Sequence, residues 1–326
     1  AAQRQEEPQW QQQVSMEHGD QACTSSSEKT ALAAARELYG QMPAAVAKKY
    51  GDVESYEWWE QHTDLFEEAR QEWGMLCPAI YDLIAPFSDG CGGKMPPASR
   101  WLRPHVQSSL QDGSPAALRS VLQEVCCDSV GHKVYRVELF TDEFCDLLLT
   151  ELDHFERSKI PLRRPNGMNR YGAILSHLGF QERLLEPLVQ AVVQPFAREL
   201  WPEWVGAADC TETYGFVVRY RVGEDVDLAL HADTSNVTLN ACLGREFEGG
   251  DLYFKGVRFT GSADDAEEWP VAHRRGSALI HLGGHFHGVR PLANGDRSNL
   301  VLWATGSQGM VRIRPTTPHE GGCKAL

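Results

Sequence analysis

Residues 230–243 read LHADTSNVTLNACL, and the second half of this stretch, Val237–Leu243, is a short, β-rich run without glycine or proline. Such a run is typical of a β-strand. Four similar runs occur in the same part of the chain, separated by turns that contain Gly, Asp or Asn: Phe216–Tyr220, Asp251–Phe254, Ala278–Leu282 and Leu300–Ala304. Many short strands of this kind predict a β-sandwich or jelly roll.

Helical patterns come before these strands. Thr141 is a good helix cap, and the Asp and Glu that follow it suit the positive end of a helix dipole. We predict further helices at Ser27–Gly40, Tyr50–Trp73, Pro115–Val125 and Gln181–Leu200, the last bent or divided by Pro187 and Pro195, and a loop at Pro86–Pro104. Helices followed by a run of strands predict an α+β fold.

Composition divides the chain into four parts. Residues 1–27 are rich in Gln, Glu and Ser, which favours a disordered leader. Residues 28–130 are expected to be a mainly helical region, residues 131–315 the catalytic domain, and residues 316–326 a tail. The first residue is Ala rather than Met, which indicates a trimmed chain.

The charge of the chain bears on its partners. The 326 residues carry a net charge of −14, whereas phosphate backbones usually bind basic surfaces, so a nucleic-acid partner is not expected. No apolar run is long enough to span a membrane. The odd number of cysteines, nine, argues against a fully paired disulfide framework and favours a soluble, intracellular protein with reduced thiols. The oligomeric state cannot be read from the sequence.

The first candidate site is the pair His231 and Asp233. Residues two apart on an extended chain point to the same face, so both side chains can reach one metal ion. A third ligand should come from a distant strand, and His287 is the candidate. Two imidazoles and one carboxylate form the facial triad that leaves positions open on iron(II).

Arg297 lies ten residues after His287. A guanidinium group at that distance suits a bidentate grip on the distal carboxylate of 2-oxoglutarate, whose other end would chelate the metal. Tyr220 comes before the His-x-Asp pair, and its hydroxyl group is a candidate for a further hydrogen bond to the same carboxylate.

The order Tyr, His-x-Asp, Gly-Gly, His, Arg, Trp is similar to the catalytic domain of the prolyl and lysyl hydroxylases, a family of iron(II)- and 2-oxoglutarate-dependent oxygenases. One animal branch of these oxygenases resembles this chain from Val134 to Thr305, through RPNGMNRYG at 164–172, LNACLG at 239–244 and GGDLYF at 249–254.

The resemblance implies a double-stranded β-helix, with His231, Asp233 and His287 as the iron ligands. It implies that Arg297 and Tyr220 bind 2-oxoglutarate and that Trp303 forms one wall of the co-substrate site. It also implies ascorbate as the reductant and a prolyl or lysyl side chain of a protein as the substrate. Asn166, Asn169 and Tyr171 are either residues of the substrate mouth or structural turn residues.

Three alternatives remain open at this stage. His281 and His285 offer imidazoles close to His287, although we expect His281 inside a strand. The substrate is alternatively a nucleobase or a small metabolite. In the third alternative, the chain is a catalytically silent binding module that uses its N-terminal helices.

Overall fold

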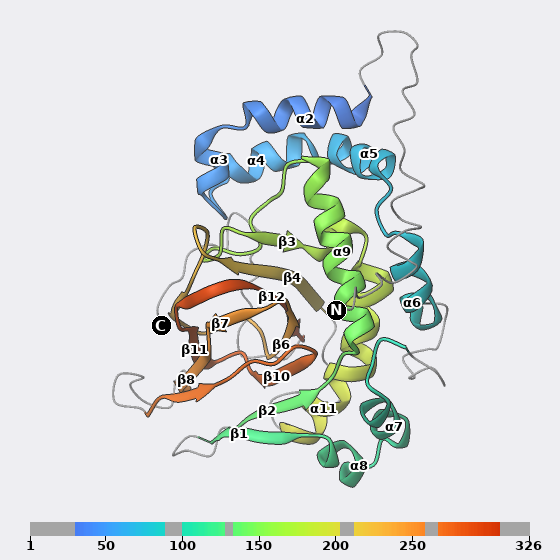
Figure 1. Cartoon of the computed structure of the whole chain (residues 1–326), viewed down its shortest axis with the longest axis vertical. Helices are drawn as coiled ribbons and strands as arrows, with labels where there is room; N and C mark the ends of the chain where they lie inside the picture. Colours follow the sequence, from blue (N-terminus) through green and yellow to red (C-terminus); the bar gives the residue numbers. More distant parts are fainter. Residues whose placement is uncertain (1–29, 89–99, 128–132, 203–211, 258–266, 307–326) are drawn as a thin grey trace, which may run out of the picture. The chain divides into compact units, whose positions relative to one another are not determined.

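The β-rich half of the chain folds as two sheets in the computed structural model, which describes residues 30–88, 100–127, 133–202, 212–257 and 267–306 (Figure 1). The larger sheet has the strand order β1-β2-β10-β6-β12-β4-β3, with β7 paired to β12, and the smaller has the order β5-β11-β8-β9. All the strand pairs are antiparallel.

The chain passes repeatedly between the two sheets: β4 and β6 lie in the larger one, whereas β5 and β8 lie in the smaller one, and β10, β11 and β12 alternate in the same way. This alternation defines a double-stranded β-helix, so the α+β fold class expected from the sequence is confirmed. The strand bounds are β1 Gln123–Cys127, β2 Lys133–Glu138, β3 Gly172–Ile174, β4 Glu212–Arg221, β5 Leu228–His231, β6 Val237–Gly244, β7 Phe247–Gly249, β8 Leu252–Val257, β9 Trp269–Val271, β10 Ser277–Leu282, β11 His285–Val289 and β12 Leu292–Thr305.

The two faces of the larger sheet have different roles. In β12, the apolar side chains of Leu300 and Leu302 join the core that the helices share, whereas Val301 joins a second core between the sheets. Since side chains alternate along a strand, Arg297, Asn299 and Trp303 share the inner face with Val301. In β6 the same alternation puts Asn240 on the inner face.

Helices cover the outer face of the larger sheet (Figure 1). Phe144, Leu148 and Phe155 of α9 belong to the core on that face together with Leu188 and Phe196. The α-helices are α2 Ala31–Gln41, α3 Ala44–Lys48, α4 Val53–Gln61, α5 Thr63–Trp73, α6 Pro78–Ser88, α7 Pro104–Asp112, α8 Pro115–Ser120, α9 Asp142–Ser158, α10 Glu186–Leu188 and α11 Gln194–Leu200. A 3₁₀-helix spans Leu175–Leu178, and π-helical turns span Gln181–Leu185 and Val189–Val193.

Several helix predictions are confirmed. The Thr141 hydroxyl accepts a hydrogen bond from the amide of Phe144 and caps α9 as expected. Residues 181–200 form one run of helical turns in which Pro187 and Pro195 are the second residues of α10 and α11, each of which follows a π-helical turn. Each proline lacks a backbone N–H, so the run is divided at both positions as predicted.

Other predictions are wrong in detail. The helix predicted at Pro115–Val125 ends at Ser120, and strand β1 begins at Gln123. Residues 50–73 form two helices instead of one, because the backbone leaves helical geometry at His62. The first helix continues one residue past Gly40, while its predicted cap, Ser27, the leader 1–27 and the tail 316–326 lie outside the described residues.

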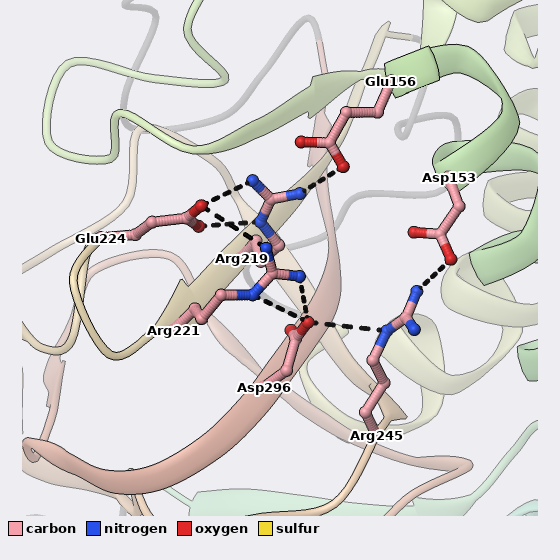
Figure 2. Close-up of polar contacts among 7 residues, drawn as sticks. All are labelled: Asp153, Glu156, Arg219, Arg221, Glu224, Arg245 and Asp296. Carbon is pink, nitrogen blue, oxygen red and sulfur yellow. Dashed lines mark hydrogen bonds and ion pairs between the residues drawn. The ribbon is translucent and has the colours of Figure 1, made fainter.

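Charged side chains tie α9 to the strands beside it (Figure 2). Arg219 of β4 donates to the carboxylate of Glu156 at 2.8 Å and to that of Glu224 at 2.9 Å. These contacts hold the C-terminal half of α9 against the turn that follows β4. The other members of the network are Arg221, Arg245, Asp153 and Asp296.

Within the described ranges, no helix is long and apolar enough to cross a bilayer. Cys77, Cys145 and Cys242 are free thiols, and burial raises the pKa of Cys145 to about 12. This thiol therefore stays protonated at neutral pH and packs as a small apolar side chain.

Glu151 joins the N-terminal helices to α9. Its side chain is fully buried, and its carboxylate accepts hydrogen bonds from the backbone amides of Leu76 and, at 3.1 Å, of Cys77, just before α6. A carboxylate at a helix N-terminus satisfies amides that have no partner within the helix.

We predict that Glu151→Ala lowers the free energy of unfolding by about 2–4 kcal/mol, since it leaves two partly buried amides without this acceptor. Glu151→Gln is the matched control, because it keeps one oxygen acceptor, and should lose less. Urea denaturation measures both values. A loss in Glu151→Ala no larger than that in Glu151→Gln would contradict this role.

Candidate functional site

Strand pairing brings His231 and His287 together. In the antiparallel pair of β5 and β11 these two residues lie directly opposite each other, and their ring centroids are 4.3 Å apart. Asp233 follows β5, with its carboxylate oxygens 3.6 Å from His231 Nε2 and 3.8 Å from His287 Nε2. The three potential ligand atoms lie within 4.8 Å of one another, and no other such group of His, Cys, Asp or Glu occurs in the part of the chain that the structure describes.

Backbone carbonyls set the tautomer of both imidazoles. His231 Nδ1 contacts the carbonyl oxygen of Ala229, and His287 Nδ1 contacts that of His285, each at 2.9 Å. A carbonyl can only accept, so each Nδ1 carries a hydrogen, and in the neutral imidazole Nε2 is then the nitrogen with the free lone pair. Both Nε2 atoms face the Asp233 carboxylate, which is the arrangement that a metal ion requires of its ligands.

Burial keeps the His231 imidazole neutral. Its pKa is lowered to about 4, first by burial and then by the nearby His287. A neutral imidazole is the form that binds a metal, so proton competition at this residue is weak at neutral pH.

Asp233 is positioned by two hydroxyl groups. Thr238 donates its hydroxyl hydrogen to Asp233 Oδ2 at 2.6 Å, so Ser235 must be the donor in its 2.8 Å contact with Thr238. Burial would raise the pKa of Asp233, but the surrounding histidines and the Thr238 hydroxyl bring it below its ordinary value. The carboxylate is therefore ionised, oriented and available as a ligand.

Of the two other histidines, neither belongs to this group of possible ligands. His281 lies inside β10, as predicted, and packs edge-on against His287 with ring centroids 4.8 Å apart, while its Nδ1 donates to the Leu282 carbonyl at 2.9 Å. His285 is also buried, with its ring 5.2 Å from that of Phe254. His287 thus lies next to His231 and Asp233, whereas His281 packs against the His287 ring and His285 packs against Phe254.

Arg297 lies opposite Tyr220 in the pairing of β12 with β4, and its guanidinium carbon is 5.3 Å from the centroid of the Tyr220 ring. The Arg297 side chain is completely buried. No carboxylate of a described residue lies within ion-pair distance of it. A buried cation without a protein anion favours an anionic ligand beside it.

A cavity of about 350 Å³ joins these residues. Its lining includes the three candidate ligands together with Arg297, Tyr220 and Trp303, and also Asn166 and Asn169. Tyr171 does not line this cavity; it lines a second one of about 530 Å³ beside α9 and β4. The arrangement can hold a metal ion at one end and a carboxylate at the other.

Several polar residues around Arg297 were not predicted from the sequence. Asn240 and Asn299 line the cavity, and His273 lies buried next to them. The alternation along β6 and β12 could have identified the two asparagines, because each stands among inward-facing residues. No local pattern marks His273, which lies between β9 and β10.

The chain is similar in sequence to iron- and 2-oxoglutarate-dependent oxygenase domain proteins. The family model for an OGFOD2-like domain matches residues 97–206. The chain is 40% identical over 228 residues to the mouse 2-oxoglutarate and iron-dependent oxygenase domain-containing protein 2, which covers 65% of either chain. The human protein of the same name is 41% identical over 220 residues, and the resemblance stated from the sequence is confirmed.

More distant relatives include the chicken procollagen-lysine,2-oxoglutarate 5-dioxygenase 1, which is 29% identical over 203 residues, 58% of this chain and 25% of that one. Among solved structures, a Pseudomonas putida prolyl-4-hydroxylase aligns over 59% of this chain and 93% of its own, with 14% identity and a TM-score of 0.38. The chain spans 65% of the length of the mouse relative.

We predict that His287→Gln loses metal binding whereas His285→Gln retains it, because only His287 offers a lone pair next to His231 and Asp233. His281→Gln should lower stability without changing the metal stoichiometry of the folded protein. Elemental analysis of iron in the three purified variants measures the difference. Iron loss in His285→Gln together with retention in His287→Gln would show that the ligand register is wrong.

Proposed function

We propose that this protein is an iron(II)- and 2-oxoglutarate-dependent dioxygenase that hydroxylates an unactivated C–H bond of a protein substrate. One observation carries the proposal: a fully buried guanidinium group, with no carboxylate partner among the residues that the structure describes, shares a cavity with a His-Asp-His group. A molecule with a metal-chelating end and a distal carboxylate fits both ends of that cavity.

The candidate ligands would be His231, Asp233 and His287. Three ligands from one side leave half of an octahedral coordination sphere for exchangeable ligands. Iron(II) and 2-oxoglutarate, when bound, supply the redox chemistry in which dioxygen converts 2-oxoglutarate to succinate and carbon dioxide and one oxygen atom enters the substrate C–H bond. The protein contributes the position of the ligands, their protonation states and the shape of the cavity.

Arg297 and Tyr220 would hold the distal carboxylate. The Tyr220 oxygen receives a hydrogen bond from Asn169 Nδ2 at 3.3 Å, which leaves its own hydrogen free to donate. Burial raises the pKa of Tyr220 to about 12, so the phenol remains protonated at neutral pH. A protonated phenol and a guanidinium group are both donors, which suits a carboxylate and disfavours a cation.

Apolar side chains would keep water away from the reacting groups. Trp303 packs edge-to-face on Phe216, with ring centroids 5.1 Å apart, and both line the cavity together with Val218 and Val301. Charge interactions are stronger where water is excluded, so the Arg297 guanidinium group would bind the carboxylate of 2-oxoglutarate more tightly.

We propose a prolyl or lysyl side chain as the hydroxylated group, because the motifs resemble those of the prolyl and lysyl hydroxylases and a more distant relative is named a procollagen-lysine dioxygenase. Asn166 and Asn169 line the cavity, and we propose that they contact the substrate; Asn166 Oδ1 also accepts hydrogen bonds from the backbone amides of Met168 and Asn169, as a turn residue does. Ascorbate is proposed as the reductant that keeps the metal in its iron(II) state. The alternatives that the experiments below distinguish are a nucleobase substrate, a small-metabolite substrate and a catalytically silent binding role.

We predict that Arg297→Ala raises the KM for 2-oxoglutarate by roughly ten- to several-hundred-fold, because it removes a charge-assisted bidentate contact. Iron binding should change little, which separates this variant from those of the metal ligands. Arg297→Lys keeps the positive charge but loses the planar pair of N–H donors. Its KM for 2-oxoglutarate should lie between those of Arg297→Ala and the wild type. Succinate formation in the absence of substrate gives the KM values. An unchanged KM in Arg297→Ala would assign the carboxylate to another residue.

The net charge of −14 leads to a prediction about the substrate class. Generic duplex DNA should not bind at moderate ionic strength, because a protein that neutralises few phosphates gains little from counterion release. Fluorescence anisotropy with labelled duplex DNA at increasing salt measures this. Submicromolar binding that weakens steeply with salt would favour a nucleobase substrate instead.

A further inference from the structure

Arg297 is surrounded by neutral acceptors. Its Nε donates to Asn299 Oδ1 at 3.0 Å, its Nη2 donates to His273 Nδ1 at 3.3 Å, and its Nη1 donates to the carbonyl oxygen of Gly250. A guanidinium group has five N–H bonds. Three are used in these contacts, so one remains on each of the two terminal nitrogens. Those two are available to a carboxylate in the cavity.

Hydrogen bonding fixes the tautomer of His273. Its Nε2 contacts the backbone carbonyl oxygen of Asn240 at 3.1 Å, so Nε2 must carry the hydrogen. Its Nδ1 faces two donors, the guanidinium of Arg297 and, at 3.0 Å, the Asn299 amide nitrogen, so Nδ1 must accept. An imidazole with one donor and one acceptor is neutral.

Asn299 completes the arrangement. Its amide oxygen accepts from Arg297, while its amide nitrogen donates to Asn240 Oδ1 at 2.6 Å and to His273. A reversed amide would place its nitrogen against the guanidinium group. The four side chains are therefore mutually oriented, and each is at most 8% exposed.

We propose that His273, with Asn299, is a positioning residue that fixes the direction of the Arg297 guanidinium while leaving its positive charge uncompensated for 2-oxoglutarate. The inference rests on the function proposed above. An acidic side chain in either position would also orient the arginine, but it would form a buried ion pair and cancel the charge that attracts the co-substrate. A neutral acceptor gives direction without neutralisation.

The burial of His273 agrees with this role. Burial lowers its pKa well below the ordinary value, and the positive charge of Arg297 lowers it further. The imidazole thus stays neutral next to the guanidinium group throughout the physiological pH range.

A matched pair of variants tests the proposal. In His273→Asn the amide oxygen is placed to replace Nδ1 as the acceptor, and His273→Asp has almost the same shape but carries a negative charge. Both lose the contact with the Asn240 carbonyl, so they differ mainly in charge next to Arg297. Isothermal titration calorimetry of the manganese(II)-loaded proteins gives the Kd for 2-oxoglutarate, and the melting temperature and manganese(II) affinity are measured beside it.

We expect His273→Asn to bind 2-oxoglutarate within about threefold of the wild type and His273→Asp to bind at least about tenfold more weakly, as is typical for the loss of a charge-assisted contact. Manganese(II) affinity should be similar in all three proteins. Equal Kd values in the two variants, whether normal or weakened, would overturn the proposal, because a purely structural role does not distinguish Asn from Asp.

Arg297→Ala separates the two proposals. If Arg297→Ala weakens 2-oxoglutarate binding and the two His273 variants bind alike, only the role of His273 is wrong. If Arg297→Ala binds 2-oxoglutarate as the wild type does, the proposed co-substrate site itself is wrong.

Discussion

The burial of the Arg297 charge is the constraint on which the site depends. Moving an unpaired charge from water into a protein interior is costly, and a protein usually avoids the cost by pairing the charge or by keeping it solvated. Here the guanidinium group is fully buried, and its protein contacts are Asn299, His273 and the Gly250 carbonyl. These acceptors satisfy part of its hydrogen-bonding capacity but none of its charge. The account therefore requires an anion from outside the protein, which the proposed co-substrate provides.

The double-stranded β-helix makes such a site possible because its strands have two distinct faces. On the outer face, apolar side chains of β6, β10 and β12 pack under the helices, and this core supplies most of the buried apolar surface. On the inner face the same strands carry polar residues at alternate positions, among them Asn240, His281 and Arg297. The stability gained on one face thus offsets the cost of polar burial on the other.

Much of the fold could be predicted from the sequence, because short β-rich runs such as Val237–Leu243, bounded by turn residues, carry a strong strand signal. The strands β5 and β11 were not predicted as strands, since runs of only four and five residues that contain candidate ligands carry little periodicity. The start of β1 was assigned to a helix because the apolar pattern continues past Ser120, where backbone geometry ends α8. Local patterns cannot resolve such a boundary.

The candidate site was predicted to a similar degree. Spacing along the chain and the resemblance to the hydroxylases together favoured His231, Asp233 and His287, with His281 and His285 left as alternatives, and the structure brings the first three together. Tyr171 was grouped with Asn166 and Asn169 by proximity in sequence, but the chain turns between them and it lines a different cavity. His273 could not be found, because its role arises from contacts with β6 and β12 that only the folded chain creates.

The central claim is that one ligand bridges the His-Asp-His group and Arg297. Its most direct test compares 2-oxoglutarate with glutarate, which has both carboxylates but lacks the keto oxygen needed for chelation, in calorimetric titrations with and without manganese(II). The account predicts that manganese(II) strengthens binding of 2-oxoglutarate by roughly 5–150-fold, the usual range for coupled sites, and leaves glutarate binding nearly unchanged. An equal effect of the metal on both acids, or no effect on either, would contradict the claim.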